Sequence, residues 1–371
     1  MLPERARRQL YRLRLLTDVR HVYLQMRFER LREAFYERLW RDAAAAIGAR
    51  CGPTRYGLLR IERGGFATFV RQSEVMLDDP MTLEVIGNKA LTYQLLAENG
   101  VNVARHTVYT MRDLAPAEIL MQQTRGPVVV KPVGGTGGGR GVTTGITTTR
   151  ELRKASRRAS RFDRHLLIEP QQQGHNYRLL YLNGRLIDAI RRDPPVLCGD
   201  GSSSIRALVR LANKFRLTAD TTTALSPLKI DNDSINWLRS EDLTPRSRPA
   251  KGELVQIKRA INENSAAQNH NVLAEVHPAT AELSARVIGN LGLRFVGLDI
   301  ICRDISAPLE AQNGYISEIN TQPGIHHHYL VAEPEKRVPV AELLLDEMFG
   351  AAQGVMQVSL PPKSRAPLEA A

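Results

Sequence analysis

The sequence predicts an α+β fold in which antiparallel strand pairs and helices are mixed along the chain. The clearest observation is a hairpin, because Arg178–Leu182 and Arg185–Ala189 are short, largely apolar runs joined by the turn dipeptide Asn183-Gly184. A second is the β-branched run at 127–130, which is typical of a strand. A third is that helix-length segments lie between such runs without the regular alternation of a parallel sheet.

The other elements are predicted in order from apolar periodicity and turn residues. Near the start we expect strands at 56–61 and 66–70 around Gly64-Gly65, then helices at 80–86 and 89–98, the second ended by Asn99-Gly100. A basic helix at 150–161 and a strand at 165–168 follow the run at 127–130. The remaining predicted elements are a helical patch near 204–214, strands at 254–257, 294–302 and 315–319, and helices at 279–291 and 340–349.

The composition is that of a globular chain of two or three packed units. Of its 371 residues, 43% are hydrophobic and 24% are charged. No apolar run reaches the length needed to cross a bilayer, and the start lacks the apolar stretch and cleavage site of a signal peptide. Cys51, Cys198 and Cys302 form no CxxC pair, which argues against a disulfide framework and favours a cytoplasmic location.

The first fifty residues are strongly basic. They hold twelve arginines against six acidic residues, about half of the net charge of +12. Apolar residues recur between the arginines at helical spacing, at Leu24, Phe28, Leu31, Phe35 and Leu39. We expect a helix packed on the protein's own core or on a sister subunit. A patch for nucleic acid or an acidic membrane surface is the minor alternative, since no nucleic-acid-binding motif accompanies it.

The most informative segment is VVVKPVGGTGGGRGV at residues 128–142. Its strand leads to Lys131, and the glycines from Gly134 to Gly141 let backbone N–H groups point at phosphates. A flexible surface linker is the alternative, but linkers rarely follow a β-branched strand directly. The chain has no Walker motif, the dinucleotide-binding spacing fails, and kinase HRD and DFG strings are absent. A glycine lid between strands is the interpretation that remains.

A second group of candidate residues lies far downstream in two apolar strands. Asp299 is in GLDII, and Glu318 and Asn320 are in YISEIN. Residues two apart on a strand face the same side, so Glu318 and Asn320 lie together. Because unpaired carboxylates are costly to bury, these oxygens indicate Mg²⁺ that bridges substrate phosphates. A hydrogen-bonded structural carboxylate is the alternative.

In this order, the motifs resemble the ATP-grasp superfamily of carboxylate–amine ligases. The resemblance is strongest to the ATP-grasp region of cyanophycin synthetases and bifunctional glutathione synthetases, and runs from about Ile86 to Leu330. It rests on IGNKALTYQLLAENGVNV, GHNYRLLYLNGRL, CGDGSSSIRALV, AEVHPATAELSARVIGNLGL, GLDIICRDISAPL and ISEINTQPG. It implies an ATP-grasp fold, with a small lid that carries the glycine loop over a larger metal-binding subdomain.

The resemblance also implies a role for each matching residue. ATP would be bound by Lys89, Lys131, Gly135, Thr136, Gly137, Gly138, Gly139, Gly141, Glu169 and Asn176. Asn176 departs from the family pattern, which has an acidic residue at the ribose. Mg²⁺ would be bound by Asp299, Glu318 and Asn320. Lys131, Arg178 and Arg259 would act at the phosphates and the acyl substrate, with Asn262 just beyond.

The function implied is amide or peptide bond formation from a small carboxylate and an amine, such as amino acids or short peptides, through an acyl-phosphate. A catalytically degenerate ATP-binding partner module is the alternative, and a nucleic-acid-associated protein is a third possibility. The Mur-ligase-like module of cyanophycin synthetase has no counterpart in the sequence, so we expect a stand-alone ligase, possibly a homo-oligomer, and not a maker of the branched polymer.

The same reasoning divides the chain into three parts. Residues 1–85 form a basic helical and hairpin unit, 86–335 the ATP-grasp domain, and 336–371 a last helix with a disordered tail. Within the domain we expect the lid at about 125–190 and a mobile excursion at about 199–251. His326-His327-His328 follows the metal strand; three adjacent residues cannot all face one ion, so we expect them to line the acceptor pocket or to pack there.

Overall fold

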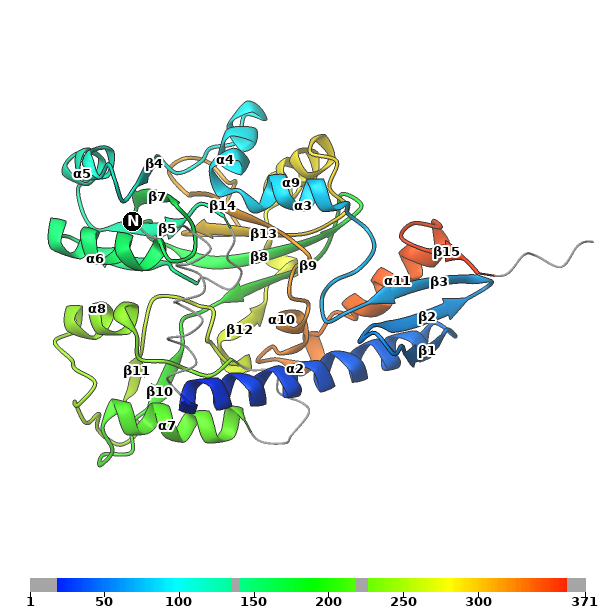
Figure 1. The fold of residues 1–371 in the computed structure, drawn as a ribbon, viewed down its shortest axis with the longest axis horizontal. Coiled ribbons are helices and arrows are strands. Elements are labelled where there is room, and N and C mark those ends of the chain that lie inside the picture. Colours follow the sequence, from blue (N-terminus) through cyan, green and yellow to red (C-terminus); the bar gives the residue numbers. More distant parts are fainter. Residues whose placement is uncertain (1–18, 135–139, 218–225, 359–371) are drawn as a thin grey trace, which may run out of the picture.

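The computed structural model describes residues 19–134, 140–217 and 226–358, and it shows an α+β protein with two main antiparallel sheets. Figure 1 shows these sheets in the body of the molecule, with the long helix α2 running along one side. The α+β prediction is confirmed. No helix in the described ranges combines the length and the apolar character needed to cross a membrane.

The larger sheet has five strands in the order β12-β9-β8-β13-β14. They are β8 (His175–Leu182), β9 (Arg185–Arg192), β12 (Asn269–Asn271), β13 (Phe295–Cys302) and β14 (Gly314–Thr321). The β8–β9 hairpin turns at Asn183 and Gly184, whose φ angles of 48° and 74° are the conformation that Asn-Gly adopts readily. Helices α3 (Pro80–Gly87), α4 (Lys89–Glu98) and α9 (Pro278–Asn290) share the core of this sheet.

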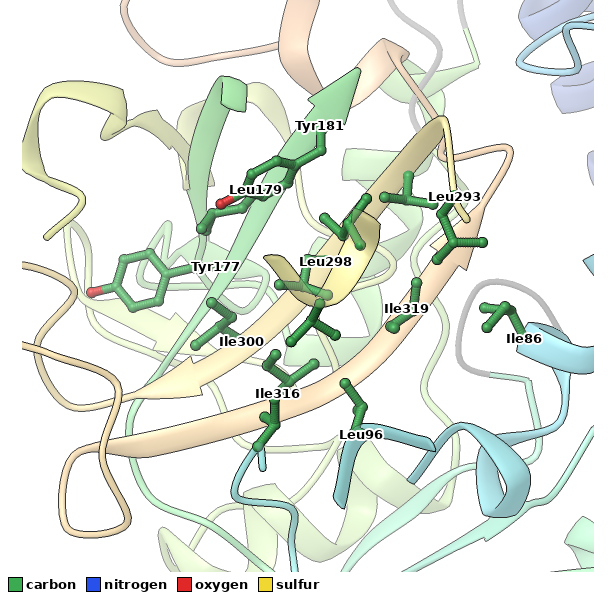
Figure 2. Close-up of a cluster of buried hydrophobic side chains, with 14 of the residues drawn as sticks. Ile86, Leu96, Tyr177, Leu179, Tyr181, Leu293, Leu298, Ile300, Ile316 and Ile319 are labelled. Carbon is green, nitrogen blue, oxygen red and sulfur yellow. The ribbon is translucent and has the colours of Figure 1, made fainter. Parts of the chain in front are cut away.

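Central strand β13 shows how this sheet divides its two faces. Val296, Leu298 and Ile300 are fully buried in the core, where Leu298 and Ile300 lie beside Ile316 and Ile319 of β14 (Figure 2). Because side chains alternate along a strand, Gly297 and Asp299 project to the opposite face. The polar side chains of the sheet can therefore gather on the face that carries Gly297 and Asp299.

The smaller sheet has four strands in the order β4-β7-β5-β6. They are β4 (Thr107–Thr110), β5 (Val128–Pro132), β6 (Thr143–Ile146) and β7 (His165–Pro170), with α5 (Ala115–Gln122) and α6 (Thr149–Ala159) in the same core. The range in which we expect the lid, 125–190, thus holds β5, β6 and β7 of this sheet together with β8 and part of β9 of the larger one.

The two ends of the described chain meet in one unit. Helix α2 (Val19–Ala46) is followed by β1 (Arg50–Pro53), β2 (Leu59–Arg63) and β3 (Phe66–Val70), and β15 (Met356–Gln357) completes their sheet. Fully buried Trp40 of α2 and Leu344 of α11 (Val340–Gly350) lie in one core, which also includes residues of β8 and β9. The basic helix therefore packs on the protein's own core.

The described part of the excursion has a small core of its own. Its helices α7 (Ile205–Arg216) and α8 (Asn232–Ser240) share this core with the flanking strands β10 (Val196–Cys198) and β11 (Leu254–Gln256), around Ile205, Leu238 and Ile257. The remaining short elements are η1 (Ala266–Gln268), η2 (Leu273–Glu275), α10 (His326–Tyr329) and η3 (Pro334–Lys336).

Candidate active site

A buried ion pair lies where the two sheets meet. Lys131 Nζ on β5 is 2.9 Å from Glu169 Oε1 on β7, and their side chains are only 9% and 6% exposed. Lys131 also donates to the Tyr93 hydroxyl at 2.9 Å, and that hydroxyl lies 3.0 Å from the carbonyl oxygen of Ser317 on β14. Tyr93 thus connects the smaller sheet to the larger one. Although burial lowers the pKa of Lys131, the Glu169 carboxylate outweighs it and raises that pKa, so Lys131 is a cation.

A second ion pair lies on β13, one of the two strands predicted to bind the metal. Arg178 of β8 is directly opposite Asp299 of β13 and donates to both of its carboxylate oxygens, through Nε and, at 2.9 Å, through Nη2. Asn320 Nδ2 donates to Asp299 Oδ2 at 3.1 Å. Burial lowers the pKa of Arg178, but Asp299 outweighs it and raises that pKa. Arg178, Asp299 and Asn320 therefore lie together.

The third predicted metal ligand faces a lysine. Glu318 is opposite Asp299 in the β13–β14 register, and its Oε1 is 3.1 Å from Lys89 Nζ at the start of α4. A β-bulge follows Asp299 at this point, and Ser317 Oγ donates to the Asp299 carbonyl oxygen at 3.1 Å. Bulges turn side chains out of the regular alternation and are frequent beside active sites.

The approach to the glycine loop is described on both sides, whereas Gly135, Thr136, Gly137, Gly138 and Gly139 lie outside the described residues. The backbone N–H of Lys89 donates to the carbonyl oxygen of Val133 at 2.9 Å, so α4 begins against the strand that leads into the loop. At Gly141 φ is +83°, and a Cβ would come within 2.8 Å of the Phe162 ring. Only glycine fits there without strain.

The structure places Arg259 away from these ion pairs. Its guanidinium lies over the Trp237 ring, 4.5 Å from the centroid, and its backbone N–H donates to Asp233 Oδ2 at 3.1 Å. No ion pair joins it to Asp299 or Glu318 in the part of the chain that the structure describes. Asn176 lies nearer to the Arg178–Asp299 pair, since it is two residues before Arg178 on β8 and so shares the same face of the sheet.

A polar cleft of about 520 Å³ opens where β7 continues into the larger sheet. It is lined by amide side chains after Glu169, by the ends of β13 and β14, and by the segment after α4: Asn102–Arg105, Gln171–Gln173, Ile301, Arg303, and Ala311–Tyr315. Its rim joins elements of both sheets. The cleft is therefore next to the Lys131–Glu169 pair and has room for a flat polar group.

Sequence reasoning missed two residues here. Tyr93 lies four residues after Lys89 on α4, so helical spacing could have placed both on one face. Arg192 ends β9, and its Nη2 is 3.2 Å from His327 Nε2. Its position could not be read from spacing, because it depends on how α10 returns to the sheet.

Gly297 permits the close approach of Arg178. A Cβ there would lie 2.7 Å from Arg178 Cδ and 2.9 Å from Pro323 Cβ. We expect Gly297→Ala to lower the free energy of unfolding by about 1–3 kcal/mol, because overpacking displaces both neighbours. Urea denaturation measures this. Gly289→Ala is the control, because nothing lies within 4 Å of its added methyl group on α9. Equal stability of Gly297→Ala and wild type would contradict the close packing.

The fold is the ATP-grasp fold, and the chain is similar in sequence to cyanophycin synthetases and to glutathione biosynthesis bifunctional proteins. It is 28% identical over 334 residues to the cyanophycin synthetase of Trichormus variabilis, covering 84% of this chain and 36% of that protein. It is 25% identical over 294 residues to the glutathione biosynthesis bifunctional protein of Clostridium perfringens, covering 78% and 38%.

The solved structures support the same fold. A bifunctional glutathione synthetase from Pasteurella multocida superposes with a TM-score of 0.53 at 22% identity, covering 82% of this chain and 42% of that one. No family model matches the sequence. The chain spans little more than a third of the length of the two curated relatives named above.

Proposed function

We propose that this protein is an ATP-dependent ligase that joins a carboxylate to an amine through an acyl-phosphate. The observation that carries the proposal is the meeting of charged groups from both sheets. Lys131 and Glu169 come from the smaller sheet, Asp299 and Glu318 from the larger one, and Tyr93 bridges the two. The relatives include cyanophycin synthetases and glutathione biosynthesis proteins, whose names support ligation.

In this proposal the ATP-grasp region is residues 86–335, and the smaller sheet, β4-β7-β5-β6, forms its lid. The cleft beside Gln171–Gln173 accepts the adenine, with Asn176 near the ribose. Lys89 and Lys131 neutralise phosphate oxygens, since each is a cation held by a carboxylate from another element. The glycine loop supplies backbone donors around the phosphates.

The donor set on β13 and β14 fits Mg²⁺. Asp299 and Glu318 face each other across the strands, and the Asn320 amide lies beside Asp299. No group of three or more acidic, histidine or cysteine side chains converges as a metal cage in the described residues. Mg²⁺ commonly uses one or two carboxylates together with substrate phosphates, so this set is sufficient. When bound, the ion neutralises charge on the transferring phosphate.

The reaction requires positioning and charge more than a nucleophilic side chain. A carboxylate oxygen of the substrate attacks the γ-phosphorus, the bond to the ADP oxygen breaks, and an acyl-phosphate forms. The amine nitrogen then attacks the acyl carbon, loses a proton, and phosphate leaves from the tetrahedral intermediate. Arg178 is the residue best placed to stabilise the developing oxyanion, because it lies against Asp299 on the same face.

The degenerate-module alternative is disfavoured by the site itself. Lys89 pairs with Glu318, Lys131 pairs with Glu169, and Asn320 donates to Asp299. A module without turnover would not require this set. Arg259 acts in the proposal only if the excursion moves, because its guanidinium now stacks on Trp237.

Product analysis tests the proposed function. Purified protein is incubated with magnesium-ATP and pooled amino acids and short peptides, and the nucleotide and new masses are identified. We expect ADP and phosphate in equal amounts, together with an amide product. Release of AMP would refute the acyl-phosphate route. ATP binding without turnover over the whole pool would favour the degenerate module.

A further inference from the structure

Helix α2 reaches the candidate active site through the histidines of α10. Arg32 Nη2 is 3.1 Å from His326 Nε2, and the Tyr36 hydroxyl is 2.8 Å from His326 Nδ1. The His326 ring lies 3.9 Å from that of His327, whose Nε2 accepts from Arg192 on β9. Arg32 and Arg192, which are 160 positions apart in sequence, are thus linked through two neighbouring imidazoles whose planes are tilted by 38°.

Both arginines lack a carboxylate partner among the described residues, and the Nε of each is buried without an acceptor. Arg192 is only 6% exposed. Two other buried arginines show what a structural role requires: Arg178 is paired with Asp299, and Arg216 donates to the carbonyl oxygens of Ser226 and Glu263. Arg32 and Arg192 therefore have more hydrogen-bond donors than the described residues supply acceptors for.

The imidazoles do not compensate these charges. Burial, followed by the positive charges of Arg32 and Arg192, lowers the pKa of His326 well below its ordinary value. Burial, together with the positive charge of Arg178, lowers the pKa of Arg192 to about 10. The nearby carboxylates of the described residues have other partners: Asp188 is engaged by His328 at 2.6 Å and by Asn271 at 2.7 Å, whereas Asp299 and Glu318, whose charges act on Arg192 through space, are paired with Arg178 and Lys89. Burying unpaired charge is costly, so the arrangement favours an anion other than the carboxylates of the described residues.

The order of the strands in the larger sheet determines how far Arg192 lies from the predicted site of the ATP phosphates. Going across it from β14, the charged residues are Glu318, then Asp299 on β13, Arg178 on β8, and Arg192 on β9. Lys89 lies beside Glu318 at the β14 end of this row of charged residues, and α2 lies at the β9 end. Strands are about 4.8 Å apart, so the Arg192 strand lies roughly 10 Å from the Asp299 strand, away from the predicted ATP phosphates.

We propose that Arg32 and Arg192, with His327, form a subsite for a carboxylate of the substrate other than the one that reacts. This deepens the proposed function and rests on it: one substrate carries a second carboxylate about 10 Å from the reacting centre. The guanidinium fork matches a planar carboxylate in two hydrogen bonds. Helix α2, which precedes the ATP-grasp region, then completes the substrate site and selects the substrate by charge.

Direct binding to the full chain tests the subsite. The probes are glutarate, its uncharged analogue glutaramide, and inorganic phosphate, each titrated by calorimetry. We expect glutarate to bind and glutaramide not to bind. Arg32→Ala should weaken glutarate binding by about tenfold or more, since a hydrogen bond to a charged group contributes roughly 1.5–3 kcal/mol. Arg32→Lys should weaken glutarate binding less than Arg32→Ala does, because lysine keeps the positive charge but lacks the planar guanidinium that makes two hydrogen bonds.

The control variant is Arg30→Ala, an exposed arginine on the same helix, which should bind glutarate as the wild type does. Arg32 is half-buried on a helix and alanine favours helix, so Arg32→Ala should remain folded, as circular dichroism would verify. Equal binding of glutarate and glutaramide, no glutarate binding by wild type, unchanged binding by Arg32→Ala, or binding of phosphate alone would each overturn the subsite.

The ATP affinity and product analysis of the same variants separate the two proposals. Glutarate binding that depends on Arg32, in a protein that forms no ADP, would support the anion subsite and contradict the ligase. ADP and amide formation with equal KM values for both substrates in wild type and Arg32→Ala would support the ligase and overturn the subsite. An increase of about tenfold or more in one substrate KM, with ATP affinity unchanged, would support both.

Discussion

Glu318→Gln is expected to lower kcat by roughly 10²–10³-fold while leaving the protein folded. The change removes the charge that faces Lys89 and that would bind Mg²⁺, but it keeps the shape of a side chain that is about one-third exposed. The loss corresponds to about 2.7–4 kcal/mol of transition-state stabilisation. Steady-state ADP formation with the substrate pair found by product analysis measures it.

Glu335→Gln is the matched control, because Glu335 is an exposed carboxylate on η3 with no ion pair among the described residues. Its kcat should equal that of wild type. The two variants should have similar melting temperatures, which excludes unfolding as the cause. Turnover of Glu318→Gln close to that of wild type would remove Glu318 from the site.

Lys131→Met is expected to reduce stability as well as turnover. The ion pair with Glu169 is almost fully buried, so removal of Lys131 leaves a buried carboxylate whose remaining partner is Tyr93. Breaking one side of a buried pair costs about 3–5 kcal/mol. The double variant Lys131→Met, Glu169→Leu should recover most of this stability, because neither charge remains, yet it should not regain turnover.

Urea denaturation of the two single variants and the double variant measures the coupling between the charges. The exposed pair of Arg63 and Asp346, 2.8 Å apart, serves as comparison. Arg63→Met should change the free energy of unfolding by less than about 1 kcal/mol, because solvent screens surface charges. Additive effects at Lys131 and Glu169 would show that the pair contributes no coupling. Recovery of turnover in the double variant would show that Lys131 is dispensable.

Local patterns predicted much of the fold. Asn183-Gly184 placed the β8–β9 hairpin, because this dipeptide adopts positive φ readily, and the structure has it there. The strands at 294–302 and 315–319 were predicted close to β13 and β14. Strand β4 and helix α5 were not predicted. Their residues 107–122 are stabilised by contact with β7, which no local periodicity reveals.

The candidate site was predicted in part. Alternation along the strands indicated that Glu318 and Asn320 share a face, and both side chains lie on the side of Asp299. The bulge at Ser317 was not predicted, because it depends on the pairing of β14 with β13. Arg259 was carried over by resemblance, and its stacking on Trp237 comes from contacts within the excursion that sequence spacing does not encode.

The sequence by itself determined the α+β class, the order of the two lysines, the glycine loop and the strand carboxylates, since each rests on residues adjacent in the chain. Only the tertiary structure decided which side chains meet: Lys131 with Glu169, Lys89 with Glu318, and Arg32 of α2 with His326. These pairs join segments far apart in the chain, and their distances follow from how the sheets and helices bury their apolar faces together. For the same reason, the lack of a carboxylate partner for Arg32 and Arg192 among the described residues became visible only in the folded protein.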